Sequence, residues 1–406
     1  MTSVVFVAPF FAETTLRFVQ AAADLPGVSL GLVSQDPEHK LPQVLRAKLA
    51  SHFLVDDALD PAKILHAVQH LGTRMGPAQR LLGTLEELQV PLAEVRQHLS
   101  IDGMGVEAAK NFRDKSRMKT VLSAAGLPCA RHRLVSTKDE AWEFVKLVGY
   151  PVVVKPPAGA GSRNTFRVDG AEQLHEVLAM SSFSAEQPAL FEEFITGQEH
   201  SFDSVFIHGR PVWYSINHYF PGPLEVIENP WIQWAVLLPR EADKPEYDDI
   251  RRVAARSLEV LGMKTGLSHM EWFRRSDGSV AVSEVAARPP GAQFTTLISY
   301  AHDIDLYRAW AHLMVYDEFP APARRFAAGA AYLRGQGQGR VVAVHGLEEA
   351  QRELGSIVVE AKLPRAGQSA TGTYEGEGYV ILRHPDTEVV KNGLRKLIST
   401  IRVELG

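Results

Sequence analysis

The sequence predicts a mixed α/β and α+β fold built in three parts. Three observations lead to this prediction: a strand-helix-strand pattern in the first 34 residues, two alternating apolar runs around 267–287, and short strands that alternate with helices after the proline-rich stretch "FPAPARR". The chain has 406 residues, of which 45% are hydrophobic and 22% charged. This is the composition of a soluble globular protein, and the length predicts two or three domains.

The opening segment predicts a parallel sheet of Rossmann-like type. A strand over 3–9 (VVFVAPF) precedes a helix over 14–24 and a second strand over 28–34 (VSLGLVS). No G-x-G-x-x-G follows the first strand, so a dinucleotide site is not supported there. Amphipathic patterns over 61–72 and 82–99 continue the α/β structure to about residue 105.

A second part begins near "NFRDKSRMKTVLSAAGLPCARHRLV", where a charged helix start leads into a Gly-Pro stop and a strand. A helix over 139–148, the strand "VVVKP" and the loop "PAGAGSRNT" follow. Another helix over 247–262 precedes the strand pair at 267–287. After the linker near residue 320, short strands and helices over 347–353 and 386–401 predict a small C-terminal α+β part.

Composition also limits the partners. The formal net charge of −5 offers no basic field for a phosphate backbone, so small molecules are favoured over nucleic acid. The single cysteine, Cys129, excludes a disulfide within the chain and indicates a reducing, cytoplasmic compartment. The apolar N-terminus lacks a basic n-region and is interrupted by Glu13, so no membrane association is expected. The oligomeric state stays open, with a homodimer as one option.

An acidic hairpin is predicted around Asp-Gly at 277–278, because this dipeptide between alternating apolar runs is a strong hairpin signal. A two-residue loop would place Glu271 directly opposite Glu284. Like charges in that position are destabilising, and a bridging divalent cation such as Mg²⁺ would offset the repulsion. Two alternatives remain open: both acids face solvent, or a three-residue bulged loop shifts the register and separates them.

The alternation of the same hairpin adds two neighbours to this site. Ala286 and Arg288 lie on the face of Glu284, so a guanidinium stands at the rim of the cation site. His269 lies opposite Ala286. A histidine satisfied by hydrogen bonds is favoured there over a metal ligand.

Upstream, "VVVKPPAGAGSRNT" predicts an anion site. Lys155 ends a buried strand and precedes a loop with Gly159 and Gly161, whose backbone N–H groups can approach phosphate oxygens closely. The loop is not of the G-x-x-x-x-G-K-[ST] type, and an ordinary surface turn is the alternative.

The segment "ALFEEFITGQEHSFDSVF" places Glu192, Glu193 and Glu199 around a glycine turn between two apolar stretches. An acid there can accept hydrogen bonds from ribose hydroxyls, and the backbone of a linking strand can bind an adenine edge. A solvated acidic face is the alternative.

Taken in order, the segments "RDKSRM", "VVVKP" with its glycine loop, "EEFITGQE", "HMEWF" and "EVAARPPG" resemble the ATP-grasp superfamily. The resemblance covers about residues 110–300. It implies a three-part architecture: a Rossmann-like domain over 1–108, an ATP-grasp domain over 109–320, and a small α+β domain over 321–406 that completes the ATP-grasp unit. It also implies ATP and Mg²⁺ as cofactors, with Mn²⁺ as an alternative ion.

The resemblance further implies a set of site residues, which divide into phosphate, nucleoside, metal and catalytic groups. These are Lys115 and Lys155 on the ATP phosphates, with Lys155 also catalytic; Gly159, Gly161 and Ser162 in the loop that closes over the phosphates; Glu192, with the backbone of Glu193 and Ile195, on the adenine; Glu199 on the ribose; Glu271 and Glu284 on Mg²⁺; and Arg288, a catalytic residue, on the carboxylate and acyl-phosphate oxygens.

One position departs from the family pattern. The family commonly reads Glu-x-Asn-x-Arg where this chain reads "EVAAR", so Ala286 replaces an amide ligand. This loss is expected to weaken a second metal site. The same segment also resembles variants expected among ligases that join amino acids, so Ala286 does not indicate an inactive protein.

The reaction implied is ATP-dependent activation of a carboxylate as an acyl phosphate, followed by attack of an amine. Two alternatives are kept: a carboxylase-like or purine-pathway enzyme that activates bicarbonate or formate, and a nucleotide-binding protein without turnover. Candidate substrate residues stand in "SINHYFPGPLEVIENPWIQWAVLLPRE" and, with Arg288, are His218, Tyr219, Trp231 and Trp234. Packing of a long loop is the alternative for these aromatic residues.

Overall fold

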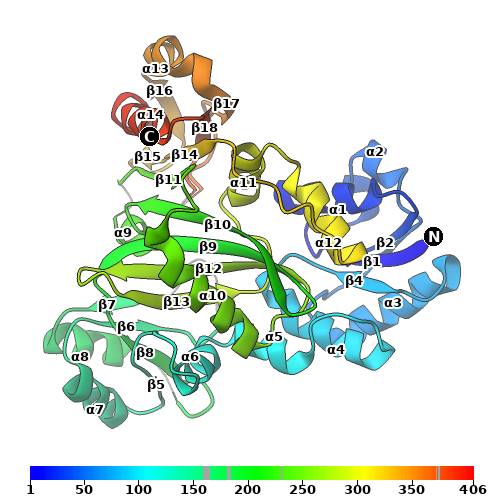
Figure 1. Ribbon diagram of the computed structural model, residues 1–406, viewed down its shortest axis with the longest axis horizontal. Coiled ribbons are helices and arrows are strands. Elements are labelled where there is room, and N and C mark those ends of the chain that lie inside the picture. The colour runs from blue at the N-terminus through cyan, green and yellow to red at the C-terminus, as the bar shows by residue number, and fades with distance from the viewer. Residues whose placement is uncertain (159–164, 181–183, 230–231, 372, 374) are drawn as a thin grey trace.

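The computed structural model describes residues 1–158, 165–180, 184–229, 232–371, 373 and 375–406 (Figure 1). Within these residues the chain forms four β-sheets, which confirms the predicted mixture of α/β and α+β structure. The N-terminal sheet and its helices lie on one side of a large central sheet. The C-terminal residues lie on another side of that sheet, near strands β14 (Ala327–Leu333) and β18 (Gly378–His384) (Figure 1). No helix of the described residues has the length and hydropathy of a membrane span.

The N-terminal part is a parallel sheet with helices, as its β-α-β opening predicts. Its strand order is β3-β2-β1-β4, and its strands are β1 (Thr2–Val7), β2 (Val28–Ser34), β3 (Ser51–Leu54) and β4 (Arg80–Leu82). The helices are α1 (Glu13–Ala23), α2 (Gln43–Arg46), α3 (Pro61–Met75) and α4 (Gln89–Leu99), with 3-10 turns η1 (Glu38–Lys40) and η2 (Glu86–Leu88).

The amphipathic pattern over 82–99 is only partly helical. Leu81 and Leu82 belong to the edge strand β4, because they pair with Val5 and Phe6 of the buried strand β1. The helix therefore begins only at Gln89, after the η2 turn. Ladder hydrogen bonds to a neighbouring strand outweigh the helical periodicity of these apolar residues.

A four-stranded antiparallel sheet follows, in the order β5-β8-β6-β7. It consists of β5 (His132–Val135), β6 (Val152–Lys155), β7 (Phe166–Val168) and β8 (Ala189–Glu193), and its helices are α7 (Lys138–Val148) and α8 (Ala171–Met180) (Figure 1). A capping box of Thr137 and Glu140 starts α7. The strand predicted from "VVVKP" is thus β6, and Lys155 is its last residue.

The central sheet has eight strands in the order β13-β12-β9-β10-β11-β14-β18-β17. Its bounds are β9 (Gly197–Ile207), β10 (Arg210–Phe220), β11 (Trp234–Leu238), β12 (Gly266–Arg275), β13 (Val280–Ala286), β14 (Ala327–Leu333), β17 (Val358–Lys362) and β18 (Gly378–His384). The sheet is continuous across residue 320, because β11 pairs with β14. The bounds of the three domains themselves stay a prediction.

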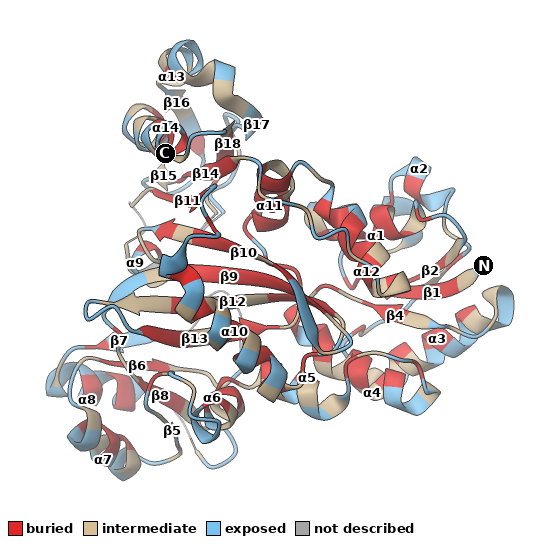
Figure 2. Ribbon diagram, in the orientation of Figure 1, coloured by how far each residue is buried: buried red, intermediate tan, exposed pale blue. Residues whose placement is uncertain are grey.

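Helices cover both faces of the central sheet, and most of the sheet interior is buried (Figure 2). On one face pack α5 (Val106–Arg113), α6 (Lys115–Ala124) and α10 (Asp248–Leu261), against Met270 and Trp272 of β12. On the other face pack α11 (Phe294–His302) and α12 (Leu306–Tyr316), against Leu267. Alternation along β12 therefore turns His269 and Glu271 toward the side of α11.

The remaining elements complete the C-terminal part. A three-stranded sheet in the order β15-β19-β16 consists of β15 (Gly335–Gln336), β16 (Val341–His345) and β19 (Arg402–Leu405). Helices α13 (Leu347–Leu354) and α14 (Thr387–Thr400) confirm the two predicted there. The short elements are α9 (Pro223–Glu228), η3 (Pro245–Tyr247) and η4 (Gly355–Ile357).

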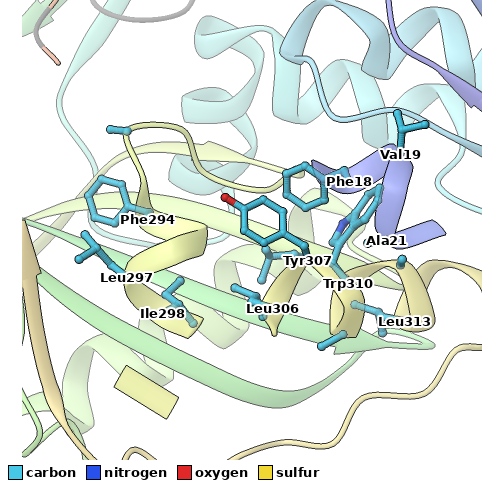
Figure 3. Close-up of a cluster of buried hydrophobic side chains, with 14 of the residues drawn as sticks. Phe18, Val19, Ala21, Phe294, Leu297, Ile298, Leu306, Tyr307, Trp310 and Leu313 are labelled. Atoms are coloured by element: carbon cyan, nitrogen blue, oxygen red, sulfur yellow. The ribbon is translucent and has the colours of Figure 1, made fainter. Parts of the chain in front are cut away.

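An aromatic cluster joins the N-terminal part to the central sheet (Figure 3). The ring of Phe18 in α1 lies 4.7 Å from Tyr307 and 4.9 Å from Trp310, both in α12. Phe294 of α11 belongs to the same buried cluster. The N-terminal part therefore packs through α12 on the face of the sheet toward which Glu271 points.

Candidate active site

The acidic hairpin forms with the predicted pair of carboxylates. Glu271 of β12 pairs with Glu284 of β13, and His269 pairs with Ala286. The side chains of Glu271 and Glu284 are 32% and 27% exposed, so both reach the protein surface. The pairing confirms that two acids oppose each other, which rules out a register that separates them.

The turn of this hairpin differs from the prediction. The N–H of Arg275 donates to the carbonyl of Ser279 at 2.9 Å, which leaves 276–278 as a three-residue loop. The predicted two-residue loop is wrong, because Gly278 takes the left-handed conformation (φ 82°) that closes a three-residue turn. A β-bulge at Ser283 adds one residue to β13 and restores the predicted pairing of the acids.

Two predicted lysines stand beside the acids. The Nζ of Lys115 lies 2.9 Å from Oε1 of Glu284, and the Nζ of Lys155 lies 3.0 Å from Oε2 of Glu192. The two lysine side chains are only 9% and 12% exposed. Asp114 caps α6 and makes Lys115 its first residue. These cations come from different elements, and the fold brings them together at the acidic hairpin and strand β8.

The carboxylates differ in their pKa. Burial raises the pKa of Glu284, but Lys115 and Lys155 outweigh it and leave that pKa below its ordinary value. Burial and the charge of Glu284 raise the pKa of Glu271. Burial and the charge of Glu271 raise the pKa of Glu199 well above its ordinary value. A cation bound at Glu271 would therefore favour the ionised forms of Glu271 and Glu199, the two acids whose pKa is raised.

The donor set fits a magnesium ion that is shared with phosphate. Mg²⁺ commonly takes one or two carboxylates and completes its shell with phosphate oxygens and water. In the described part of the chain no group of three or more His, Cys, Asp or Glu is arranged to hold a metal. Ala286 offers no donor beside Glu271 and Glu284. A magnesium ion held here would therefore take two carboxylates from the described residues, with phosphate oxygens or water to complete its shell.

Two polar contacts near the acids were not predicted. The Nζ of Lys119 lies 3.4 Å from Oε1 of Glu192, and the Lys119 side chain is 1% exposed. The sequence signal for Lys119 was its spacing of four residues from Lys115, because residues four apart on one helix lie on the same face. The Nδ1 of His269 lies 2.6 Å from Oδ1 of the fully buried Asp203. His269 is thus satisfied by a hydrogen bond, as expected.

Arg288 is held by an acid from the N-terminal part. Its Nε donates to Oε2 of Glu86 at 2.6 Å, and its Nη1 donates to the carbonyl of Pro289 at 2.9 Å. Glu86 is 202 positions away in sequence, so no local pattern indicates this contact. Arg288 also lines a cavity of about 340 Å³ between β4, the start of β12 and α12.

We expect Glu86→Gln to lower kcat about 10-fold with little change in the KM for ATP, because Arg288 loses the charge that orients it. Steady-state kinetics of ADP formation measure this effect. Glu87→Gln is the matched control, since Glu87 is the exposed neighbour. An unchanged kcat in Glu86→Gln would contradict a positioning role for this carboxylate.

The predicted nucleoside residues lie along β8 and the start of β9. The N–H of Glu193 donates to the carbonyl of Arg131 at 2.9 Å. The predicted contact of the Glu193 backbone with adenine would therefore use its carbonyl. Ile195 is buried in a small apolar cluster. Glu199 of β9 pairs with Phe273 of β12. It lies two residues from Ser201, which pairs with Glu271 across the same two strands. Gly159, Gly161, Ser162 and Trp231 lie outside the described residues.

The comparisons with known proteins agree with this geometry. The profile of the ATP-grasp domain matches residues 148–297, from before β6 to within α11. The solved L-amino acid ligase of Bacillus licheniformis superposes with a TM-score of 0.79 at 18% identity and covers 100% of this chain and 99% of its own. The chain contains an ATP-grasp domain over the matched residues 148–297.

Other ATP-grasp relatives support the ligase type of the resemblance. An L-arginine-specific L-amino acid ligase of Bacillus subtilis is 25% identical over 280 residues, which is 66% of this chain and 67% of that protein. The chain spans about half the length of other curated relatives it matches. A carboxyaminoimidazole ribonucleotide synthase of Aspergillus clavatus, solved with ATP, has a TM-score of 0.72 at 17% identity over 99% of both chains. ATP as cofactor and ATP-dependent ligation as reaction class agree with these relatives.

Three aromatic candidates for substrate binding that the structure describes, His218, Tyr219 and Trp234, are packed side chains. Trp234 is 1% exposed and stacks on Tyr332 with ring centroids 4.3 Å apart. Tyr219 lies 6.3 Å from Trp234 in the same cluster. The Nε2 of His218 lies 3.0 Å from the Oη of Tyr247. Their role in substrate binding stays a prediction.

Buried histidines predict an acid-sensitive fold. Burial lowers the pKa of His218 to about 4, and burial lowers the pKa of His200 and His302 to about 3. The unfolded chain binds protons at a pKa of about 6.5, whereas the folded protein does not, so the free energy of unfolding decreases as pH falls from about 6.5 toward 4. Denaturant unfolding between pH 7.5 and 5 measures this slope. His218→Gln should reduce it, and an unchanged slope would contradict the assignment.

Proposed function

We propose that this ATP-grasp chain is an ADP-forming ligase that joins a carboxylic acid to an amine, with amino acids as the substrate class. The observation that carries the proposal is the pairing of Glu271 with Glu284 beside Lys115, with Arg288 at the end of the same hairpin. The names of the two amino acid ligases among its relatives support the substrate class.

The proposed nucleotide site uses residues from four elements: α6, β6, β8 and β9. Lys115 and Lys155 bind the phosphates, because both are buried cations that now balance the carboxylates of Glu284 and Glu192. The backbone of β8 holds the adenine edge, and Glu199 accepts from the ribose. The loop with Gly159 and Gly161 is proposed to cover the phosphates.

The proposed metal site is formed by Glu271 and Glu284, with Mg²⁺ as the ion and Mn²⁺ as an alternative. A bound Mg²⁺ neutralises the charge that develops on the phosphates during transfer. The two carboxylates would hold it beside Lys115 and Lys155. Because Ala286 offers no third ligand, one ion shared with ATP is favoured over two.

The reaction then depends mainly on position and charge. A carboxylate oxygen of the acid attacks the γ-phosphorus, the bond to ADP breaks, and an acyl phosphate forms. The amine attacks the acyl carbon, phosphate leaves, and the amine nitrogen loses a proton. Arg288, a catalytic residue in this proposal, stabilises the carboxylate and acyl-phosphate oxygens, and Lys155 stabilises the transferred phosphoryl group.

A phosphate-release screen over pairs of acids and amines tests the function. We expect ADP and phosphate only when both an acid and an amine are present, with amino acid pairs most active. Turnover stimulated by bicarbonate or formate without an amine would instead favour the carboxylase-like or purine-pathway alternative. Tight ATP binding without ADP formation on any pair would favour a nucleotide-binding protein.

A further inference from the structure

The β-bulge at Ser283 decides on which face of the sheet Glu284 lies. If the register set by the three-residue turn continued unbroken, Ser283 would stand opposite Glu271, and Glu284 would stand opposite Met270. Met270 is fully buried in an apolar cluster with Trp272. A one-residue slip moves every following side chain to the other face, so the extra residue is what brings Glu284 to Glu271.

Helix α6 satisfies the backbone on both sides of Glu284. The Nζ of Lys119 donates to the carbonyl of Ser283 at 2.8 Å, and the sulfur of Met118 accepts from the N–H of Val285 at 3.2 Å. A bulge interrupts the ladder of strand hydrogen bonds, and buried backbone groups need other partners. Two consecutive residues of α6 provide these partners.

Burial of the Lys119 ammonium carries a large desolvation penalty. Its side chain is 1% exposed, and burial lowers its pKa. A buried ammonium persists only where acceptors compensate for lost water. Here the bulge carbonyl of Ser283 accepts a hydrogen bond at 2.8 Å, and the carboxylate of Glu192 forms an ion pair at 3.4 Å. One side chain therefore connects the strand of the acidic hairpin to the strand of the proposed adenine site.

We propose that Lys119 is a positioning residue that holds the Ser283 bulge and thereby fixes Glu284 opposite Glu271 for the metal. This inference rests on the proposed function, because Glu284 is a metal ligand only there. It predicts that loss of Lys119 weakens metal binding more than nucleotide binding. A residue that only stabilised the fold would affect both equally.

Electron paramagnetic resonance of Mn²⁺ bound in the presence of ADP measures the effect without turnover. We expect Lys119→Met to raise the Kd of Mn²⁺ about 10-fold, and the Kd of metal-free ADP less than about threefold. Arg117→Met is the matched control, since Arg117 lies on the same helix, is 38% exposed and pairs with Glu107. Control affinities should equal those of the wild type.

Glu284→Gln distinguishes failure of this inference from failure of the proposed function. If Glu284→Gln weakens Mn²⁺ binding and Lys119→Met does not, the role of Lys119 is overturned and the metal site stands. If neither variant changes Mn²⁺ binding, the metal site itself is overturned. Should Lys119→Met not fold, Lys119→Gln replaces it, because its amide retains a donor but cannot reach as far.

Deletion of Ser283 provides a second test. Without this residue the register of the turn continues unbroken, and Glu284 still stands opposite Glu271. In that background Lys119→Met should change the Kd of Mn²⁺ less than about twofold, against about 10-fold with the bulge present. An equal loss in both backgrounds would show that Lys119 does not act through the bulge.

Discussion

Glu284→Gln is expected to lower turnover by about 1000-fold or more while the protein stays folded. The variant removes a charged metal ligand, and it leaves the Nζ of Lys115, now 2.9 Å from Oε1 of Glu284, beside a neutral amide. Because Glu284 is 27% exposed and near-isosteric with glutamine, packing changes little. ADP formation at saturating Mg²⁺ and thermal unfolding measure the two quantities together.

Arg288→Ala should cause a loss of similar size for a different reason, since it removes the cation proposed to stabilise the acyl-phosphate oxygens. The matched control for Glu284→Gln is Glu259→Gln, a 60% exposed acid that pairs with Arg256 on the surface of α10. Turnover of the control should equal the wild type. Wild-type rates in Glu284→Gln or Arg288→Ala would overturn the site assignment.

Lys155→Met is expected to reduce both activity and stability. Turnover should fall by about 1000-fold, because a buried cation on the phosphates is lost. The free energy of unfolding should fall by about 3 kcal/mol, because Glu192, whose side chain is 6% exposed, keeps a buried charge with Lys119 as its remaining ion pair among the described residues. Denaturant titration and kinetics of ADP formation measure the two effects separately.

The double variant Lys155→Met with Glu192→Gln separates these two roles. Removing the carboxylate as well should recover part of the lost stability, since no uncompensated negative charge stays buried and the amide oxygen can still face the Nζ of Lys119. Turnover should stay low, because the phosphates still lack their cation. Recovery of activity together with stability would show that Lys155 is structural only.

Local chemistry allowed much of the site to be predicted. An Asp-Gly turn between alternating runs implied a hairpin, and this hairpin set Glu271 against Glu284. The lysine of "VVVKP" does terminate a strand, and its Nζ pairs with Glu192, an acid of the segment "ALFEEF". These features depend on neighbours in sequence or on a single strand pairing, so they can be inferred from a pattern.

Other features depend on contacts between distant segments. Glu86 reaches Arg288 only because the N-terminal part packs through α12 on the central sheet. The bulge at Ser283 forms where α6 provides Lys119 as a partner for its carbonyl. The aromatic residues around Trp234 lie in an irregular stretch of sequence, yet tertiary packing stacks Trp234 on Tyr332 of the C-terminal part.

The sequence by itself determined the order of the elements, the hairpin that carries the two acids and the resemblance to the ATP-grasp superfamily, because hydrophobic periodicity and turn residues act over short distances. Only the tertiary structure decided how the acids came to be paired. A loop one residue longer than predicted required a compensating bulge, and a buried lysine from a separate helix provides a partner for it. Burial and charge balance, which depend on the whole fold, therefore set the final position of Glu284.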